Sequence, residues 1–129
     1  MQILFRTIAQ GHSSGYRNAD QLIIDNSEQW NQLWQEHTSD VIPPVETPPI
    51  DFAENLVVAV FSGEKPTSGY GVEIISVETK TMSDCDRDCL SVRIHYNAPG
   101  SMTQDVITHP YHIVQLPQIM ASQVCFKEA

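Results

Sequence analysis

The 129-residue sequence predicts a mainly β protein, an antiparallel sandwich or partly closed barrel of about seven strands that carries one amphipathic helix at about residues 27–38. Three observations lead to this fold class. Short runs of strand-forming residues recur along the chain, a single segment has helical periodicity, and the connections in the C-terminal half are short. The length fits one domain, residues 1–129, with an ordinary hydrophobic core.

The N-terminal part predicts two strands and the helix. Residues 2–9 and 21–25 are β-compatible runs, and a turn-rich stretch with two glycines separates them. Asp25 or Asn26 can then cap a helix. Its apolar positions follow the spacing i, i+3, i+4, i+7 and are Trp30, Leu33, Trp34 and His37. We expect both indoles to pack against the body of the protein, and the four prolines between 43 and 50 predict an extended connector after the helix.

The C-terminal part predicts the remaining strands. The run LVVAVF at 56–61 lacks alternation, which is typical of a strand buried on both faces. Apolar and polar residues alternate over 90–96, which indicates a half-exposed strand. In the strand before it the apolar parity changes, and a β-bulge near residues 74 and 75 would reconcile the two halves. Two later strands are expected at 106–116 and 122–127.

The charge balance argues against several classes of partner. The chain has 7 basic and 16 acidic side chains, a net charge of −9, and no cluster of Lys or Arg, so neither nucleic acid nor an anionic membrane is an expected partner. No apolar run approaches the roughly 18 residues of a membrane helix, so we expect a soluble protein without a membrane span. The sequence leaves the compartment open: exported or periplasmic if a leader was trimmed, otherwise cytoplasmic.

Metal and cofactor motifs are weak, so no metal site and no cofactor are predicted. The aspartates at 84, 86 and 88 imitate the start of a calcium loop, but Cys89 stands where that loop needs Gly and His95 where it needs Glu. His109 and His112 are three residues apart and should point to opposite faces of an extended segment unless Pro110 bends it. We expect one of these histidines to be packed and the other solvated.

The three cysteines are an odd number, which argues against a fully oxidised disulfide framework. Cys85 and Cys89 could face each other across a hairpin tip, and Cys125 is distant in sequence. A zinc site would need further ligands that the spacing does not bring together.

Catalysis has no positive support. Residues 11–15, GHSSG, match the G-x-S-x-G nucleophile elbow in letters, but that elbow requires a strand-to-helix turn on a parallel sheet. We expect a small polar turn here. No other nucleophile has an evident base, so the protein is not expected to be an enzyme.

The stretch GEKPTSGYGVEI at 63–74 predicts a stiff loop beside a strand. Pro66 presets φ and Gly69 can adopt a positive φ, so the chain can reverse tightly and display Thr67, Ser68 and Tyr70. Two interpretations remain open. The loop is either a surface for a partner or a plain turn from which Tyr70 packs inward.

These motifs resemble the PrcB C-terminal domain family. The stretches that carry the resemblance are EQW and LW within 28–34, DF at 51–52, FSGEKPTSGYGVEI at 61–74, APG at 98–100 and THPYHIVQLP at 108–117. The family is named after an accessory subunit that associates with and stabilises a secreted subtilisin-like bacterial protease. Its members usually have PTGGY, where this chain has Ser68, which leaves the turn type open.

A fainter similarity links the chain to chagasin-type cysteine-protease inhibitors, which are immunoglobulin-like sandwiches that insert loops into a protease cleft. Their N-P-T-T-G-Y loop is similar to residues 65–70, and their R-P-W or R-P-F loop is distantly similar to 109–111. Their middle G-x-G-G loop is missing here.

Together, the resemblances imply a non-enzymatic protein-interaction domain that serves as an accessory or stabilising partner of a protease. The expected partner-binding residues are Pro66, Thr67, Ser68, Gly69, Tyr70, His109, Pro110 and Tyr111. One alternative is a chagasin-like protease inhibitor. Another is a small-ligand-binding β domain lined by His95, His109 and His112. The sequence does not predict the oligomeric state or the identity of the partner.

Overall fold

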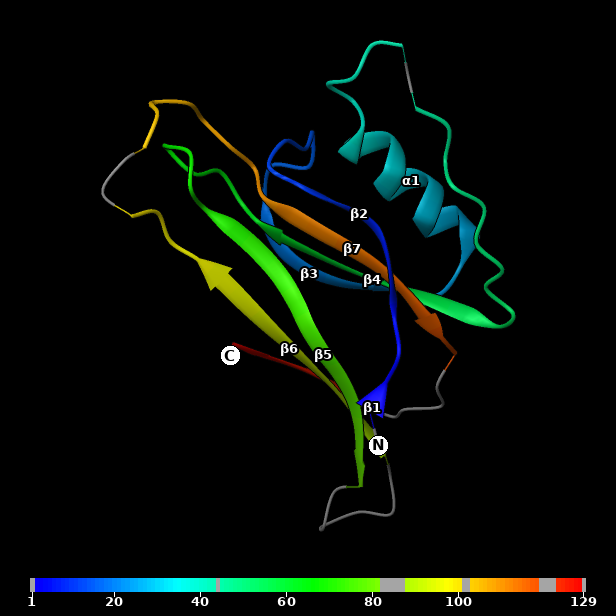
Figure 1. Cartoon of the computed structure of the whole chain (residues 1–129). Helices are drawn as coiled ribbons and strands as arrows, with labels where there is room; N and C mark the ends of the chain where they lie inside the picture. Colours follow the sequence, from blue (N-terminus) through cyan, green and yellow to red (C-terminus); the bar gives the residue numbers. More distant parts are fainter. Residues whose placement is uncertain (1, 44, 82–87, 101–102, 119–122, 129) are drawn as a thin grey trace.

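A computed structural model describes residues 2–43, 45–81, 88–100, 103–118 and 123–128 of the protein (Figure 1). In chain order the strands are β1 (Gln2–Ile3), β2 (Arg6–Gly11), β3 (Ala19–Ile24), β4 (Asn55–Ser62), β5 (Gly71–Thr81), β6 (Asp88–Asn97), β7 (Tyr111–Pro117) and β8 (Gln123–Glu128). The helix α1 spans Ser27–His37 and lies between β3 and β4 in the sequence.

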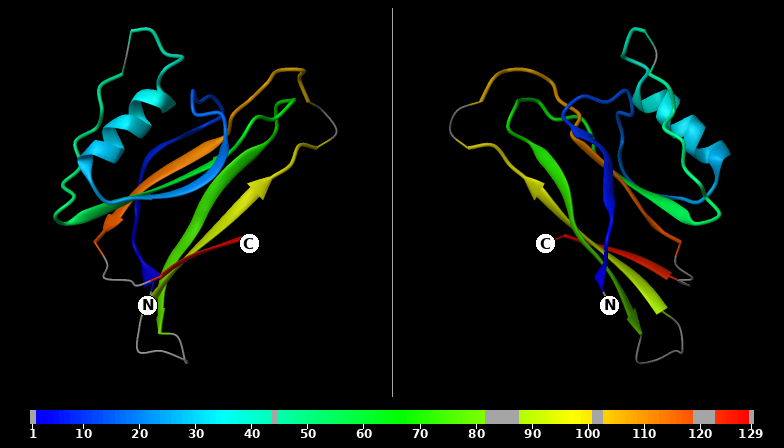
Figure 2. Two further views of the ribbon diagram at one scale, coloured as in Figure 1. Left: turned by 180° about the vertical axis from the view of Figure 1, so that it is seen from behind. Right: turned by 45° about the vertical axis from the view of Figure 1, so that its right-hand side comes forward.

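The strands form two four-stranded sheets that pack face to face, with α1 on the outer side of one of them. One sheet has the order β1-β5-β6-β8 and the other the order β2-β7-β4-β3. Figure 2 shows that α1 lies against the sheet of β4 and β7, away from β5 and β6. The predicted mainly β sandwich with a single helix is confirmed. It is not antiparallel throughout, because β8 pairs with β6 in the parallel direction.

Strand β4 belongs to two apolar cores, which explains its unbroken run of apolar residues. Leu56, Val58 and Val60 face the core between the sheets. The alternate residues Val57, Ala59 and Phe61 face the core beneath the helix. All six side chains are buried, so the prediction of a strand covered on both faces is confirmed.

The predicted helix and its packing are also confirmed. The side chain of Asn26 accepts a hydrogen bond from the backbone N–H of Gln29, so Asn26 rather than Asp25 is the N-cap. Both indoles are buried and donate to the connector that follows the helix. Trp30 Nε1 lies 2.9 Å from the carbonyl oxygen of Pro48, and Trp34 Nε1 lies 3.3 Å from that of Val45. These bonds hold the connector along the helix.

Strand β5 contains the expected irregularity. Its antiparallel register with β6 shifts between Ile74 and Ser76, which confirms the predicted bulge. The extra residue changes which side chains face the core, so Val72, Ile74 and Val77 are all buried although their parities differ.

Two strand predictions are corrected by the structure. The run 2–9 is not one strand but two, and β1 and β2 belong to different sheets, with the 85% exposed Leu4 between them. The strand predicted at 106–116 begins only at Tyr111, because residues 103–110 form a loop tied to a neighbouring loop.

The predicted hairpin tip with Cys85, and most of the calcium-like stretch, lie outside the described residues. Within the described part of the chain, no helix has the length and apolar character needed to cross a membrane.

Candidate functional site

Two loops lie side by side at one end of the sandwich. We call them the paired loops: residues 64–70, before β5, and residues 103–109, before β7 (Figure 1). The backbone N–H of Lys65 donates to the carbonyl oxygen of Thr108 at 2.8 Å, and the N–H of Thr108 donates to that of Lys65 at 2.9 Å. This antiparallel bridge links segments about 40 residues apart in sequence.

Further hydrogen bonds close the pair near its tip. The N–H of Ser68 donates to the carbonyl oxygen of Gln104, and the N–H of Gln104 donates to Ser68 Oγ at 2.9 Å. The hydroxyl of Thr108 donates to the carbonyl oxygen of Thr67. Ser68, where the family usually has Gly, therefore supplies an acceptor that holds the opposite loop.

Gly69 occupies a position that only glycine fits. Its φ is +91°, in the region that side chains disfavour, and a Cβ built there would lie 2.6 Å from Pro99 Cβ. Pro99 belongs to the APG stretch after β6. The close approach of Gly69 and Pro99 connects two of the motifs that carry the family resemblance.

Tyr70 is neither fully displayed nor packed into the core. Its ring is half-buried at the entry to β5, and the ammonium of Lys65 lies 5.4 Å from the ring centroid. This distance is typical of a cation–π contact. The half-burial of Tyr70 leaves both interpretations of the loop open.

The paired loops expose apolar side chains that the sequence analysis missed. Val106 is 47% exposed and Ile107 is 60% exposed, and Pro66 on the other loop is also exposed. The apolar character of Val106 and Ile107 favours the strand that the sequence predicts at 106–116. Only the tie between the two loops places them on the surface.

Residues 109–111 lie at the base of the paired loops rather than at their tip. His109 and Pro110 are buried, and Tyr111 is half-buried. The rings of Tyr111 and His37 meet edge to face, with 4.3 Å between their centroids. Burial raises the pKa of Tyr111. The backbone N–H of His109 donates to the carbonyl oxygen of His12, which anchors the base of the loop. Of the eight predicted partner-binding residues, 66–70 are at least partly exposed, whereas 109 and 110 are buried and 111 is half-buried beneath the loops.

A pocket of about 330 Å³ adjoins the paired loops. It is lined by His12, Ser68, Gly69, Tyr70, Gly71, Asn97 and Thr108. A neighbouring hollow of about 440 Å³ shares His12, Gly71 and Asn97 with it. His12 comes from the GHSSG stretch, and no local pattern in the sequence marks it as a neighbour of the PTSGY loop.

His112 links the two sheets. The backbone N–H of Ile74 donates to its Nδ1 at 2.9 Å, so Nε2 carries the proton and donates to Thr7 Oγ1 at 2.9 Å. Burial lowers the pKa of His112, and the charge of Glu73 opposes this effect.

The expectation that one of His109 and His112 is solvated is wrong, because both are buried. His95 is exposed on β6, so the three histidines proposed to line a ligand site do not share a face.

The GHSSG stretch is a loop between β2 and β3, not a strand-to-helix turn. Ser14 is buried, its Oγ lies 2.7 Å from His37 Nδ1, and it accepts a hydrogen bond from the backbone N–H of Tyr16. Burial lowers the pKa of His37 from 6.5 to about 4. The pair has the spacing of a nucleophile and its base, but it is enclosed between the helix and the loop.

The comparison with known families agrees with the resemblance seen in the sequence. The model of the family described as PrcB C-terminal matches residues 56–117, which run from β4 to β7 and include both paired loops. The stretches at 28–34 and 51–52 lie outside the match. No curated protein and no solved structure matches the chain. The segment that builds the paired loops, residues 56–117, belongs to the PrcB C-terminal family.

Proposed function

We propose that this protein is a non-enzymatic interaction domain whose paired loops bind a partner protein, and that this partner is a protease that the domain assists as an accessory subunit. The observation that carries the proposal is the exposure of Val106 and Ile107 on loops that hydrogen bonds already hold in place. The family match supports the choice of a protease as the partner.

The physical argument rests on preorganisation. A loop that is ordered before binding loses little conformational entropy when a partner arrives, so more of the contact energy appears as affinity. The bonds of Ser68, Thr67 and Thr108 supply that order. The exposed apolar side chains supply surface that gains free energy when it is removed from water.

The proposed role without catalysis agrees with the enclosure of the serine–histidine pair that has the spacing of a nucleophile and its base. The Ser14–His37 pair is buried. Across residues 2–43, 45–81, 88–100, 103–118 and 123–128, no group of three or more His, Cys, Asp or Glu side chains is placed to hold a metal ion.

The test compares Ile107→Asp with Leu4→Asp, a matched change at an exposed apolar residue near the far end of β5. The assay follows the activity of a secreted subtilisin-like protease from the same organism during heating, with and without this protein. We expect the wild type and Leu4→Asp to prolong the half-life of the protease, and Ile107→Asp to bind it at least tenfold more weakly. Equal behaviour of both variants, or no effect of the wild type, would refute the proposal.

The same assay separates the accessory role from inhibition. A chagasin-like inhibitor would lower the activity of papain-like or subtilisin-like proteases reversibly. The burial of His109 and Pro110 speaks against it, because the second inhibitory loop would have to enter the protease cleft. Reversible loss of activity would replace the accessory role with inhibition.

A further inference from the structure

Strand β3 is an edge strand whose outer side carries no neighbouring strand in the described sheets. It is the last strand in the order β2-β7-β4-β3. Its register with β4 continues without a shift from the pair Ala19 and Ser62 to the pair Ile24 and Val57. The six residues, ADQLII, contain neither proline nor lysine. Such a strand offers a row of backbone donors and acceptors, of which the N–H of Gln21 already donates to Asp20 Oδ1 at 2.9 Å.

The other three edges of the described sheets are shielded in familiar ways. β1 has only two residues. The register of β2 shifts between Thr7 and Ala9. β8 carries Lys127. Short strands, bulges and lysines all hinder pairing with another chain, and β3 has none of these features.

A groove separates β3 from the helix. It has a volume of about 260 Å³ and is lined by Tyr16, Leu22, Ile23, Ile24, Gln29, Gln32, Leu33 and Glu36. The four helical positions have the spacing of one helix face, and the strand contributes apolar side chains. An apolar side chain from a neighbouring strand would find contacts on both walls.

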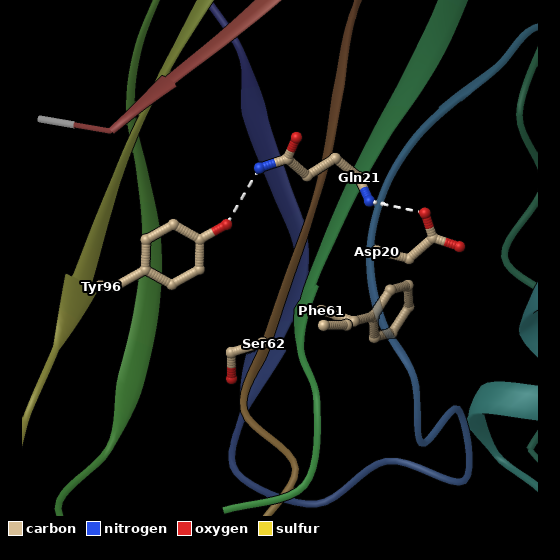
Figure 3. Close-up of a pocket in the computed structure, with 6 residues that line it drawn as sticks. Asp20, Gln21, Phe61, Ser62 and Tyr96 are labelled. Carbon is tan, nitrogen blue, oxygen red and sulfur yellow. Dashed lines mark hydrogen bonds between the residues drawn. The ribbon is translucent and has the colours of Figure 1, made fainter.

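A second hollow, of about 430 Å³, lies at the start of β3 and is more polar (Figure 3). It is lined by Ala19, Asp20, Gln21, Phe61, Ser62 and Tyr96. Gln21 Nε2 reaches from β3 toward β6 and donates to the hydroxyl of Tyr96 at 3.0 Å. Hydroxyl or amide side chains could form hydrogen bonds with the polar groups of this hollow, whereas a purely apolar side chain could not.

The charges of both hollows have one sign. Among the described residues, the charged side chains that line them are Asp20 and Glu36, and Glu36 is exposed. The carboxylate of Asp20 accepts a hydrogen bond from the hydroxyl of Tyr16 at 2.6 Å. A lysine or arginine on an arriving segment is therefore attracted, and an acidic residue is repelled.

We propose that β3 binds an extended segment of a partner protein by strand addition, and that this segment has apolar residues at alternate positions, polar residues between them and a Lys or Arg at an end. Successive side chains of a strand point to opposite faces, so the apolar set faces the groove beside α1 while the polar set faces away from it. This surface is distinct from the paired loops, and the proposal does not depend on the function proposed for them.

The test uses the full chain and a synthetic eight-residue peptide with capped ends, valine and threonine in alternation, and lysine at both ends. The lysines at both ends make the direction of the added strand immaterial. Titration is followed through the backbone amide signals of the ¹⁵N-labelled protein. We expect saturable shifts centred on residues 19–24 and on the face of α1 that lines the groove.

Two modified peptides test the pairing itself. One is N-methylated at every valine amide and the other at every threonine amide. Only alternate amides of an added strand face β3, so we expect one of the two to bind at least tenfold more weakly and the other to bind like the parent. Equal binding of both, shifts centred elsewhere, or no binding of the parent would overturn the proposal.

Matched protein variants test the charge. Glu36→Lys reverses a charge in the groove, and Glu28→Lys makes the same change on the same helix at a position outside the groove lining. We expect Glu36→Lys to bind the lysine peptide about three- to tenfold more weakly and Glu28→Lys to bind it as the wild type does. Equal effects of the two variants would overturn the proposal, as would sedimentation data showing a dimer of this chain that the parent peptide does not dissociate.

Discussion

At the scale of single residues, the paired loops depend on a few positions whose roles differ in kind. Gly69 is required by backbone geometry and by its closeness to Pro99. Ser68 is an acceptor for the opposite loop, and Thr108 both bridges the loops through its backbone and donates through its hydroxyl. These contacts fix the shape of the site, whereas Ile107 supplies exposed apolar surface.

Gly69→Ala should destabilise the protein and displace the 64–70 loop. The added methyl group must adopt a disfavoured φ and would collide with Pro99, which we expect to cost about 2 kcal/mol or more. Urea unfolding measures the change. Gly100→Ala is the matched control, because a Cβ at Gly100 meets nothing within 4 Å, and its free energy of unfolding should stay within about 1 kcal/mol of the wild type. Equal losses in both variants would contradict this account.

At the scale of elements, α1 is held from three sides. Its apolar face covers the sheet, the connector bonds to both indoles, and the loop before β3 meets its C-terminal end, where the N–H of Gly15 donates to the carbonyl oxygen of His37. The Ser14–His37 bond lies at the same end. The helix is therefore a fixed wall for the groove beside β3.

Asn26→Ala should destabilise the helix by about 1 kcal/mol, because the N–H of Gln29 loses the acceptor that caps the first turn. Asn26→Asp keeps an acceptor oxygen and adds a favourable charge at the helix N-terminus, but it replaces the amide that donates to Asp25 with a second carboxylate, so it should lose less stability than Asn26→Ala. Thermal unfolding of the three proteins measures the difference. The same loss in Asn26→Asp would show that the cap is not the cause.

In the molecule as a whole, the sheet of β2, β7, β4 and β3 has an apolar core on each face. It therefore joins the helix α1 to the second sheet. One buried histidine belongs to each of these regions. His112 bridges β7 to β2 and β5, and His37 lies among the rings of Trp34, Phe61 and Tyr111. Both histidines favour the neutral form.

The stability should therefore fall in mild acid. Burial lowers the pKa of His37 to about 4 and also lowers that of His112, so in the folded state both lie below the ordinary 6.5 of the unfolded chain. The unfolded chain then binds more protons than the folded one. This contribution is fully present above about pH 6.5 and is lost as the pH falls toward 4, at no more than about 1.4 kcal/mol per pH unit for each histidine.

Urea unfolding at several pH values between 7.5 and 4.5 measures this slope. His37→Asn should flatten it, whereas His95→Asn, at an exposed position on β6, should leave it unchanged. The slopes are compared rather than the absolute stabilities, because His37→Asn also alters packing. A free energy of unfolding that is constant or rises from pH 6.5 to 4.5 would refute the assignment.

Features that depend on neighbours along the chain are predictable from the sequence. The helix follows from a period of 3.6 residues, the doubly buried β4 from its unbroken apolar run, and the bulge in β5 from a change of parity. The positive φ of Gly69 was likewise expected from its place in a tight turn. Each of these signals reports how one segment is solvated or bent.

Which distant segments meet is a property of the folded chain. It divided residues 2–9 between two sheets, set β8 parallel to β6, buried both His109 and His112, and exposed Val106 and Ile107 by tying their loop to Lys65 and Ser68. The physical reason is that periodicity shows which face of a strand is buried but not which strand covers it. Pairing between distant segments is set by the packing of the whole chain.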